Sequence, residues 1–170
     1  MHPPAPQTSP SGTGTQPGAA PAQAPPAPPR VLIADDNPQG AELLEAYLAD
    51  SGYELRTAGD GEQTLHQVAA WHPDLILLDI MMPRISGFEV CKRLRADPAT
   101  RDVGVLMITA LDQPSDMERA VEVGADDFLT KPINKSELHL RVRSLLRSRL
   151  YKRQLDRLLG YIEGVEGGGE

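Results

Sequence analysis

The most constraining feature of the chain is a fivefold alternation between short apolar runs and longer segments that open with helix-capping residues. Strands that alternate with helices build βαβ units, in which the strands are parallel and helices cover both faces of the sheet. We therefore predict a doubly wound α/β fold with a five-stranded parallel sheet and five helices. The apolar runs are residues 31–34, 54–58, 75–78, 103–108 and 128–129.

The second run fixes the expected strand order. Charged Glu54 and Arg56 alternate there with Leu55 and Thr57, as in a strand that faces solvent on one side. Such a strand belongs at an edge, where a doubly wound sheet of order 2-1-3-4-5 places its second strand.

Helix starts can be read between the runs. Capping residues and prolines at a first helical position mark where helices begin. The signals are Asn37-Pro38, Asp60 with Gln63, Ser86 with Glu89, Pro114 with Ser115 and Glu118, and Asn134 with Glu137.

Composition limits the possible functions. The net charge of −7 argues against general nucleic-acid binding. The single cysteine, Cys91, cannot form an internal disulfide and is expected to pack in the core, which favours a reducing, cytoplasmic location. We expect no membrane span, because no run of about 18 apolar residues occurs, and no signal peptide.

The chain divides into three zones. Residues 1–29 hold ten of the sixteen prolines and, apart from His2, no ionisable side chain, so we predict a disordered tail. A docking site for a proline-reading partner is the alternative. Residues 30–150 form the predicted domain, and residues 151–170 a helix extension with a flexible Gly-rich end.

The last helix is basic, unlike the rest of the predicted domain. Residues 135–157 carry eight Lys/Arg against two Asp/Glu, whereas residues 30–134 carry nine against nineteen. A heptad-like 4-3-4 spacing then continues through Tyr151, Leu155, Leu158 and Ile162. This helix, residues 135–163, is expected to dimerise or dock on a partner, although a solvated basic face is the alternative.

Chemically useful residues follow four of the strands. Asp35 and Asp36 follow the first strand, Asp79 the third and Thr109 the fourth, while Lys131 comes just after the fifth. In an open α/β sheet, ligands bind at the carboxyl ends of the strands. Two carboxylates about 4 Å apart repel by on the order of 4 kcal/mol at an effective dielectric near 20. A lysine and a divalent cation such as Mg2+ would offset that repulsion and suit phosphoryl transfer.

This pattern resembles the receiver domains of two-component response regulators, which have a flavodoxin-like sheet. The resemblance covers residues 31–146. It is carried by Asp35-Asp36, Asp79 with Met81-Met82-Pro83 and Gly87, Thr109-Ala110, and Lys131-Pro132.

The resemblance implies a role for each of these positions. Asp79 is the expected phosphoacceptor. The expected ligands of Mg2+ or Mn2+ are Asp36, Asp79 and the backbone carbonyl of Met81, with Asp35 acting through water. Thr109 and Lys131 are expected to bind the phosphoryl group, and a cis Lys131-Pro132 peptide to aim the lysine.

A switch and its partners are implied as well. Phe128 resembles the aromatic that moves with Thr109, without the hydroxyl that a tyrosine would bring. The implied donor is a histidine kinase or phosphotransfer protein, and the implied output face is helix 4, strand 5 and helix 5, which is also a possible homodimer surface. Apolar Met81 and Leu111 beside the phosphoryl group imply slow autodephosphorylation.

Residues 94–108 and 128–150 look like the receivers of GGDEF-type diguanylate cyclases. Since neither a cyclase nor a DNA-binding helix-turn-helix follows, we expect a stand-alone receiver that signals by protein contact. Two other classes stay open. An aspartate-nucleophile phosphatase would have a second aspartate where Met81 stands, and a flavodoxin-like cofactor binder would need a phosphate-cradling loop in place of Asp35-Asp36-Asn37-Pro38.

Overall fold

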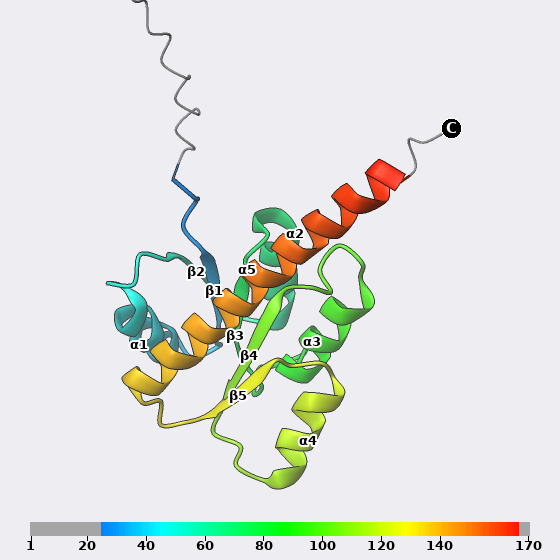
Figure 1. Ribbon diagram of the computed structural model, residues 1–170. Coiled ribbons are helices and arrows are strands. Elements are labelled where there is room, and N and C mark those ends of the chain that lie inside the picture. The colour runs from blue at the N-terminus through cyan, green and yellow to red at the C-terminus, as the bar shows by residue number, and fades with distance from the viewer. Residues whose placement is uncertain (1–24, 167–170) are drawn as a thin grey trace, which may run out of the picture.

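Five strands pair in the parallel sheet that the sequence predicts (Figure 1). The computed structural model describes residues 25–166, and the sheet order is β2-β1-β3-β4-β5. The register pairs Val31 with Leu75, and Leu75 with Gly104. The strands are β1 (Arg30–Ala34), β2 (Glu54–Ala58), β3 (Leu75–Asp79), β4 (Gly104–Thr109) and β5 (Asp127–Thr130).

Strand β2 pairs only with β1 and is an edge strand, as predicted. Glu54, Arg56 and Thr57 are exposed on it. Strand β3, in contrast, is buried over its whole length between β1 and β4. The alternation of charged and apolar residues therefore distinguished the edge from the centre of the sheet.

The helices begin close to the predicted capping residues. Asn37, Asp60 and Ser86 each accept a hydrogen bond from a backbone N–H of the helix that follows. The fourth helix starts at Pro114, as predicted, with Gln113 in the extended cap conformation and Ser115 inside the first turn. The helices are α1 (Pro38–Leu48), α2 (Gly61–Trp71), α3 (Gly87–Ala96), α4 (Pro114–Glu122) and α5 (Lys135–Glu166).

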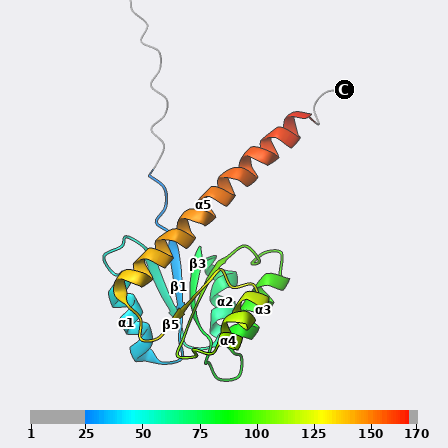
Figure 2. The ribbon, with the colours of Figure 1, turned by 60° about the horizontal axis from the view of Figure 1, so that its bottom comes forward.

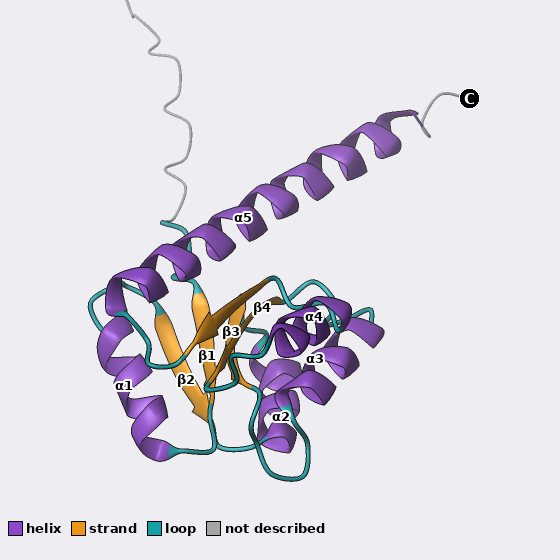
Figure 3. Cartoon of the chain, turned by 90° about the horizontal axis from the view of Figure 1, so that it is seen from below, coloured by secondary structure: helices purple, strands orange, loops and turns teal. Residues whose placement is uncertain are grey.

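Helices cover both faces of the sheet (Figure 3). On one face α2, α3 and α4 pack over Leu32, Ile76 and Met107. On the other face α1 and α5 pack over the side chains that alternate with these along the strands. Cys91 is fully buried in the first of these layers, where burial raises the pKa of its thiol to about 11, as expected of a packing residue.

Helix α5 is much longer than the sheet requires (Figure 2). Leu138 and Val142 are fully buried against the sheet, whereas the large apolar side chains from Leu150 onward are exposed. The helix runs back from the carboxyl ends of the strands and projects past their starts. Its 32 residues give a length of about 48 Å.

Some predictions fall on parts of the chain outside the described residues. The predicted Pro-rich tail lies there except for residues 25–29, which form neither helix nor strand; residues 25–28 are exposed and Pro29 is half-buried. The glycines that were expected to end the last helix, residues 167–169, also lie outside. Among residues 25–166, no helix combines the length and hydrophobicity needed to cross a bilayer.

Gly87 gives a test of the packing that holds α3 against β3. A Cβ at Gly87 would collide with the backbone carbonyl of Asp79 and lie 2.8 Å from Cα of Ile80. We expect Gly87→Ala to lower the free energy of unfolding by about 1–3 kcal/mol, measured by urea denaturation. The control is Gly160→Ala, in open space on α5, which should be neutral or stabilising because alanine is the better helix former. Equal stability of both variants would contradict this packing.

Candidate functional site

Three carboxylates meet at the carboxyl ends of β1 and β3. Because Ala34 pairs with Leu78, the next residues, Asp35 and Asp79, lie side by side. One oxygen from each of Asp35, Asp36 and Asp79 lies within 4.8 Å of the others. Asp35 and Asp79 are buried, whereas Asp36 is exposed. The sequence prediction that these residues come together is confirmed.

Backbone donors fix the two buried carboxylates. Asp35 Oδ1 accepts a hydrogen bond of 2.9 Å from the Asn37 N–H, and Asp79 Oδ1 accepts one of 3.0 Å from the Met81 N–H. Gly40 on α1 lies so close that a Cβ there would collide with Asp35 Oδ2. The second oxygen of each carboxylate is thereby turned toward the same space.

Lys131 supplies the positive charge of the site. Its Nζ lies 3.2 Å from Asp79 Oδ2 and 3.4 Å from Asp35 Oδ2. The Lys131 N–H donates to the carbonyl of Thr109 at 2.7 Å, which ties the end of β5 to β4. The peptide bond between Lys131 and Pro132 is cis, as the resemblance implies.

Burial and charge perturb both partners of this pair. Burial raises the pKa of Asp79 and Asp35 adds to that rise, against the opposing effects of Lys131 and the Met81 N–H. Burial also lowers the pKa of Lys131, but the charges and hydrogen bonds of Asp79 and Asp35 outweigh it and leave that pKa above its ordinary value. The lysine therefore stays cationic beside a carboxylate that is costly to ionise.

Thr109 and Phe128 lie on neighbouring strands beside the carboxylates. Thr109 is fully buried at the end of β4, and its Oγ1 accepts a hydrogen bond of 3.2 Å from the Leu111 N–H. Phe128 is half-buried and pairs with Met107, two residues before Thr109. Since side chains two apart on a strand share a face, Thr109 and Phe128 lie on the α4 side of the sheet.

The charge balance and the donor set fit a divalent cation. Three carboxylates face one ammonium, which leaves two negative charges if all three are ionised. Oxygen donors from few carboxylates are the ligands that Mg2+ prefers, because it keeps several waters. The Asp36 carboxylate is exposed and accepts no hydrogen bond within residues 25–166, so it is free to contribute an oxygen.

A groove beside the site adds residues that the sequence did not single out. It has a volume of about 560 Å3 and runs from Asp36 and Met81 to α4. Asp116 there has a buried Oδ2 without a hydrogen-bond partner among residues 25–166, and the Arg119 guanidinium stacks 4.4 Å from the centre of the Phe88 ring. In the sequence, Asp116 appears only as an acidic residue in the first turn of a helix. No sequence pattern indicates that its side chain is buried.

A family model for the response regulator receiver domain matches residues 31–143. The chain belongs to the response regulator receiver family. It is 50% identical over 121 residues to response regulator PleD from Caulobacter vibrioides, covering 71% of this chain and 27% of that protein. It is 46% identical over 119 residues to the DNA-binding transcriptional regulator RpaA from Synechocystis sp., covering 70% and 49%.

Among solved structures, the chain is similar to the chemotaxis protein CheY4 from Vibrio cholerae. The TM-score is 0.67 at 31% identity, and the match covers 70% of this chain and 99% of that chain. The receiver thus spans between about a quarter and a half of the length of the two curated relatives.

Membership in this family decides between the functional classes that the sequence left open. The receiver domain is a phosphorylation switch of two-component signalling rather than a catalytic enzyme. The phosphatase and the flavodoxin-like cofactor binder are therefore set aside, and the acidic cluster of Asp35, Asp36 and Asp79 belongs to a phosphoacceptor module.

Substitution of Asp79 tests the electrostatic cost of the site. Because folding raises the pKa of Asp79, its ionised form destabilises the folded state, fully so above that raised pKa. Without divalent metal at neutral pH, we expect Asp79→Asn to raise the free energy of unfolding by about 0.5–1 kcal/mol. This difference in the free energy of unfolding should shrink as the pH falls toward 3.8, the ordinary pKa of an aspartate.

Urea denaturation in the presence of a chelator, repeated over this pH range, measures the difference. Asp50→Asn is the control: Asp50 is exposed outside the site, so its replacement should change stability by less than about 0.5 kcal/mol. A destabilised Asp79→Asn variant at neutral pH would show that the carboxylate is a net stabilising group.

Proposed function

We propose that Asp79 accepts a phosphoryl group from a phosphohistidine on a histidine kinase or phosphotransfer protein. One observation supports this above all: Asp79 ends a buried strand with Lys131 Nζ at 3.2 Å and two further carboxylates within 4.8 Å. A carboxylate oxygen of Asp79 attacks phosphorus, the bond to the histidine nitrogen breaks, and the imidazole leaves with that electron pair.

The cation proposed for the site is Mg2+, with Mn2+ as a substitute. Asp36, Asp79 and the backbone carbonyl of Met81 would hold it directly, and Asp35 would do so through water. The cation supplies charge neutralisation for the transferring group. Lys131 then needs only to move from the carboxylates toward a phosphoryl oxygen, since its ammonium already lies between Asp35 and Asp79.

The proposed switch couples Thr109 to Phe128. Phosphorylation adds roughly two negative charges and three acceptor oxygens at Asp79. The Thr109 hydroxyl would leave its contact with the Leu111 N–H to bind one of those oxygens, and Phe128, half-buried on the same face, would fill the vacated space. Such a shift would alter the face formed by α4, β5 and α5.

Beryllofluoride binding tests the core of this proposal. With Mg2+ present, we expect the wild-type chain to bind beryllofluoride in a 1:1 complex at Asp79, as followed by 19F NMR and titration calorimetry. Asp79→Asn should abolish binding, because the amide cannot complete the tetrahedral fluoride complex. Asp50→Asn, an exposed aspartate outside the site, should bind like the wild type. Binding that survives in Asp79→Asn would refute the assignment.

Two apolar side chains beside the site support the proposal that phosphorylated Asp79 loses its phosphoryl group slowly. Met81 is 59% exposed and lines the groove together with Leu111, and neither side chain can orient an attacking water. We expect Met81→Asn to shorten the half-life of phosphorylated Asp79 by about tenfold, equivalent to about 1.4 kcal/mol in the barrier.

Release of phosphate after labelling with a small-molecule phosphodonor measures that half-life. Met117→Asn is the matched control, since Met117 is a methionine of similar exposure, 52%, on α4. A wild-type half-life of seconds that Met81→Asn leaves unchanged would contradict the proposal.

The proposed output is contact with another protein, in the cytoplasm, without direct nucleic-acid binding. The receiver domain is assigned to residues 30–150, between a Pro-rich tail and the helix extension. Its segments 94–108 and 128–150 resemble receivers of GGDEF-type diguanylate cyclases, and the identity with PleD agrees with a receiver of that kind.

The exposed part of α5 is the proposed homodimer surface. Tyr151, Leu155, Leu158 and Ile162 are each more than half exposed and recur at heptad-like spacing. Since the seam covers only about two heptads, it should give a weak, concentration-dependent dimer. The solvated basic face is the competing interpretation.

Paired substitutions on α5 distinguish the two. We expect Leu155→Ser with Ile162→Ser to raise the dimer dissociation constant at least tenfold, a change of about 1.4 kcal/mol, in sedimentation equilibrium with and without beryllofluoride. The control is Tyr161→Ser, which removes an exposed apolar side chain outside the seam. If the paired substitutions do not change the oligomeric state, the homodimer proposal is wrong and the exposed part of α5 is a solvated face.

A further inference from the structure

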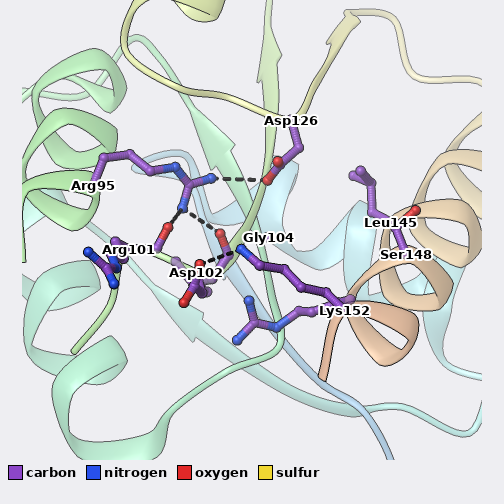
Figure 4. A pocket seen from close by; sticks show the side chains of 10 residues that line it. Arg95, Arg101, Asp102, Gly104, Asp126, Leu145, Ser148 and Lys152 are labelled. Atoms are coloured by element: carbon purple, nitrogen blue, oxygen red, sulfur yellow. Dashed lines mark hydrogen bonds and ion pairs between the residues drawn. The ribbon is translucent and has the colours of Figure 1, made fainter. Parts of the chain in front are cut away.

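A second hollow lies at the starts of β4 and β5, at the other end of the sheet from Asp79. Figure 4 shows the side chains that line it. It has a volume of about 200 Å3 between the end of α3, the start of β4 and the middle of α5. We call it the arginine basin. The residues that define it here are Arg95, Arg101, Asp102, Arg149 and Lys152.

Arg95 is a structural member of the basin. Its guanidinium donates to the carbonyls of Gly124, Arg101 and Val103 and to Asp126, at 2.6–3.0 Å, so all its nitrogens are occupied. These bonds draw the α3–β4 loop and the segment before β5 together. Arg95 therefore shapes the wall of the basin and leaves ligand binding to the other cations.

The remaining charges do not balance. Lys152 reaches across from α5 to Asp102, with Nζ 2.6 Å from Oδ1 (Figure 4). Arg101 is exposed, and within residues 25–166 its side chain forms no hydrogen bond or ion pair. With Lys152 paired to Asp102 and Arg95 to Asp126, the basin retains the charges of Arg101 and Arg149.

Arg149 is largely buried but has no close partner among residues 25–166. Its side chain is only 17% exposed, and its Nε is buried without a hydrogen-bond partner in the described part of the chain. Its ion pair with Asp74 is long, 4.0 Å, because Arg153 takes the same Asp74 oxygen at 2.8 Å. Burial lowers the pKa of Arg149, and Arg153 lowers it further. A poorly satisfied guanidinium of this kind is costly unless an anion meets it.

We propose that the arginine basin binds a small anion that carries phosphate groups, with the diphosphate group as the recognised unit. Guanidinium groups offer paired N–H donors that match phosphate oxygens. The volume suits a small ligand, and a second hollow of about 230 Å3 adjoins the basin and shares Asp102, Val103 and Arg149 with it. Arg149 thus faces both hollows and can bridge two linked phosphates.

Binding there has a consequence for α5. Arg149 and Lys152 lie where the helix leaves the domain, and the anion competes with Asp102 for the Lys152 ammonium. The ligand therefore links the α3–β4 loop to the part of α5 where this helix leaves the domain. This role is independent of phosphorylation at Asp79.

Titration calorimetry with inorganic pyrophosphate tests the proposal on the full chain, with a chelator and no divalent cation. We expect saturable 1:1 binding tighter than about 1 mM. Inorganic phosphate should bind more weakly, and ADP should compete with pyrophosphate if the diphosphate group is what the basin recognises. The Asp79→Asn variant should bind equally well, whereas binding lost with it would place the anion at the phosphorylation site and overturn the proposal.

Charge variants supply the sharper readout. Arg149→Gln should weaken binding at least tenfold, the effect expected of one charge-assisted hydrogen bond. Arg101→Gln should weaken binding several-fold; the Arg101 side chain is exposed and forms no hydrogen bond or ion pair within residues 25–166. Asp102→Asn should tighten pyrophosphate binding, because it frees the Lys152 ammonium to contact the ligand. If the basin charges had only a structural role, this substitution would not tighten binding.

The matched control is Arg147→Gln, an exposed arginine of the same helix that does not line the basin. It should bind within about twofold of the wild type, since distant surface charges are screened by salt. The proposal is overturned if no saturable binding occurs, if Arg147→Gln weakens binding as much as Arg149→Gln, or if Asp102→Asn does not tighten it.

Discussion

The bridge from Lys131 to the carboxylates of Asp35 and Asp79 holds the acidic edge of this domain together. Two buried carboxylates side by side would repel strongly, and the ammonium 3.2 Å and 3.4 Å away offsets much of that repulsion. The bridge also links the end of β5 to the ends of β1 and β3, which already pair with each other in the sheet. Its strength is limited, because burial still leaves the pKa of Asp79 raised. The fold thus contains a site that a phosphoryl group and a cation can rearrange.

Much of this arrangement followed from local sequence patterns. Short apolar runs predicted the strands, and alternation in residues 54–58 predicted the edge strand. Asn37, Asp60 and Ser86 predicted helix starts, and the rule that ligands bind at strand carboxyl ends grouped Asp36 with Asp79. The resemblance to receivers added residue roles that spacing alone could not supply. The fourth helix starts at Pro114, as its proline indicated, but its cap is Gln113, whose side chain forms no capping hydrogen bond with the helix. The sequence pattern therefore located this helix start without identifying the cap residue.

Other features depend on tertiary placement and had no signal in the sequence. Gly40 looks like an ordinary helical glycine until α1 is packed against Asp35, where a Cβ has no room. Arg149 is one of several arginines on a basic helix, and only the position of Arg153 on Asp74 leaves it poorly paired. The basic count of residues 135–157 suggested either a partner surface or a solvated face. The structure divides that helix instead, since Arg149, Lys152 and Arg153 turn to the domain while the apolar side chains beyond Leu150 face outward.

Helix α5 begins four residues after Lys131 and runs unbroken to the end of the described chain, so it can act as a lever. Its root lies beside the carboxylate cluster, its midpoint rests on Asp74 and Asp102, and its far end is free of the domain. Over about 48 Å, a rotation of about 5° around the root displaces the tip by about 4 Å. A tilt too small to disturb the packing of Leu138 and Val142 would therefore be large at Ile162. The length of the helix thus converts a small adjustment near Lys131 into a displacement of several ångströms at its exposed end.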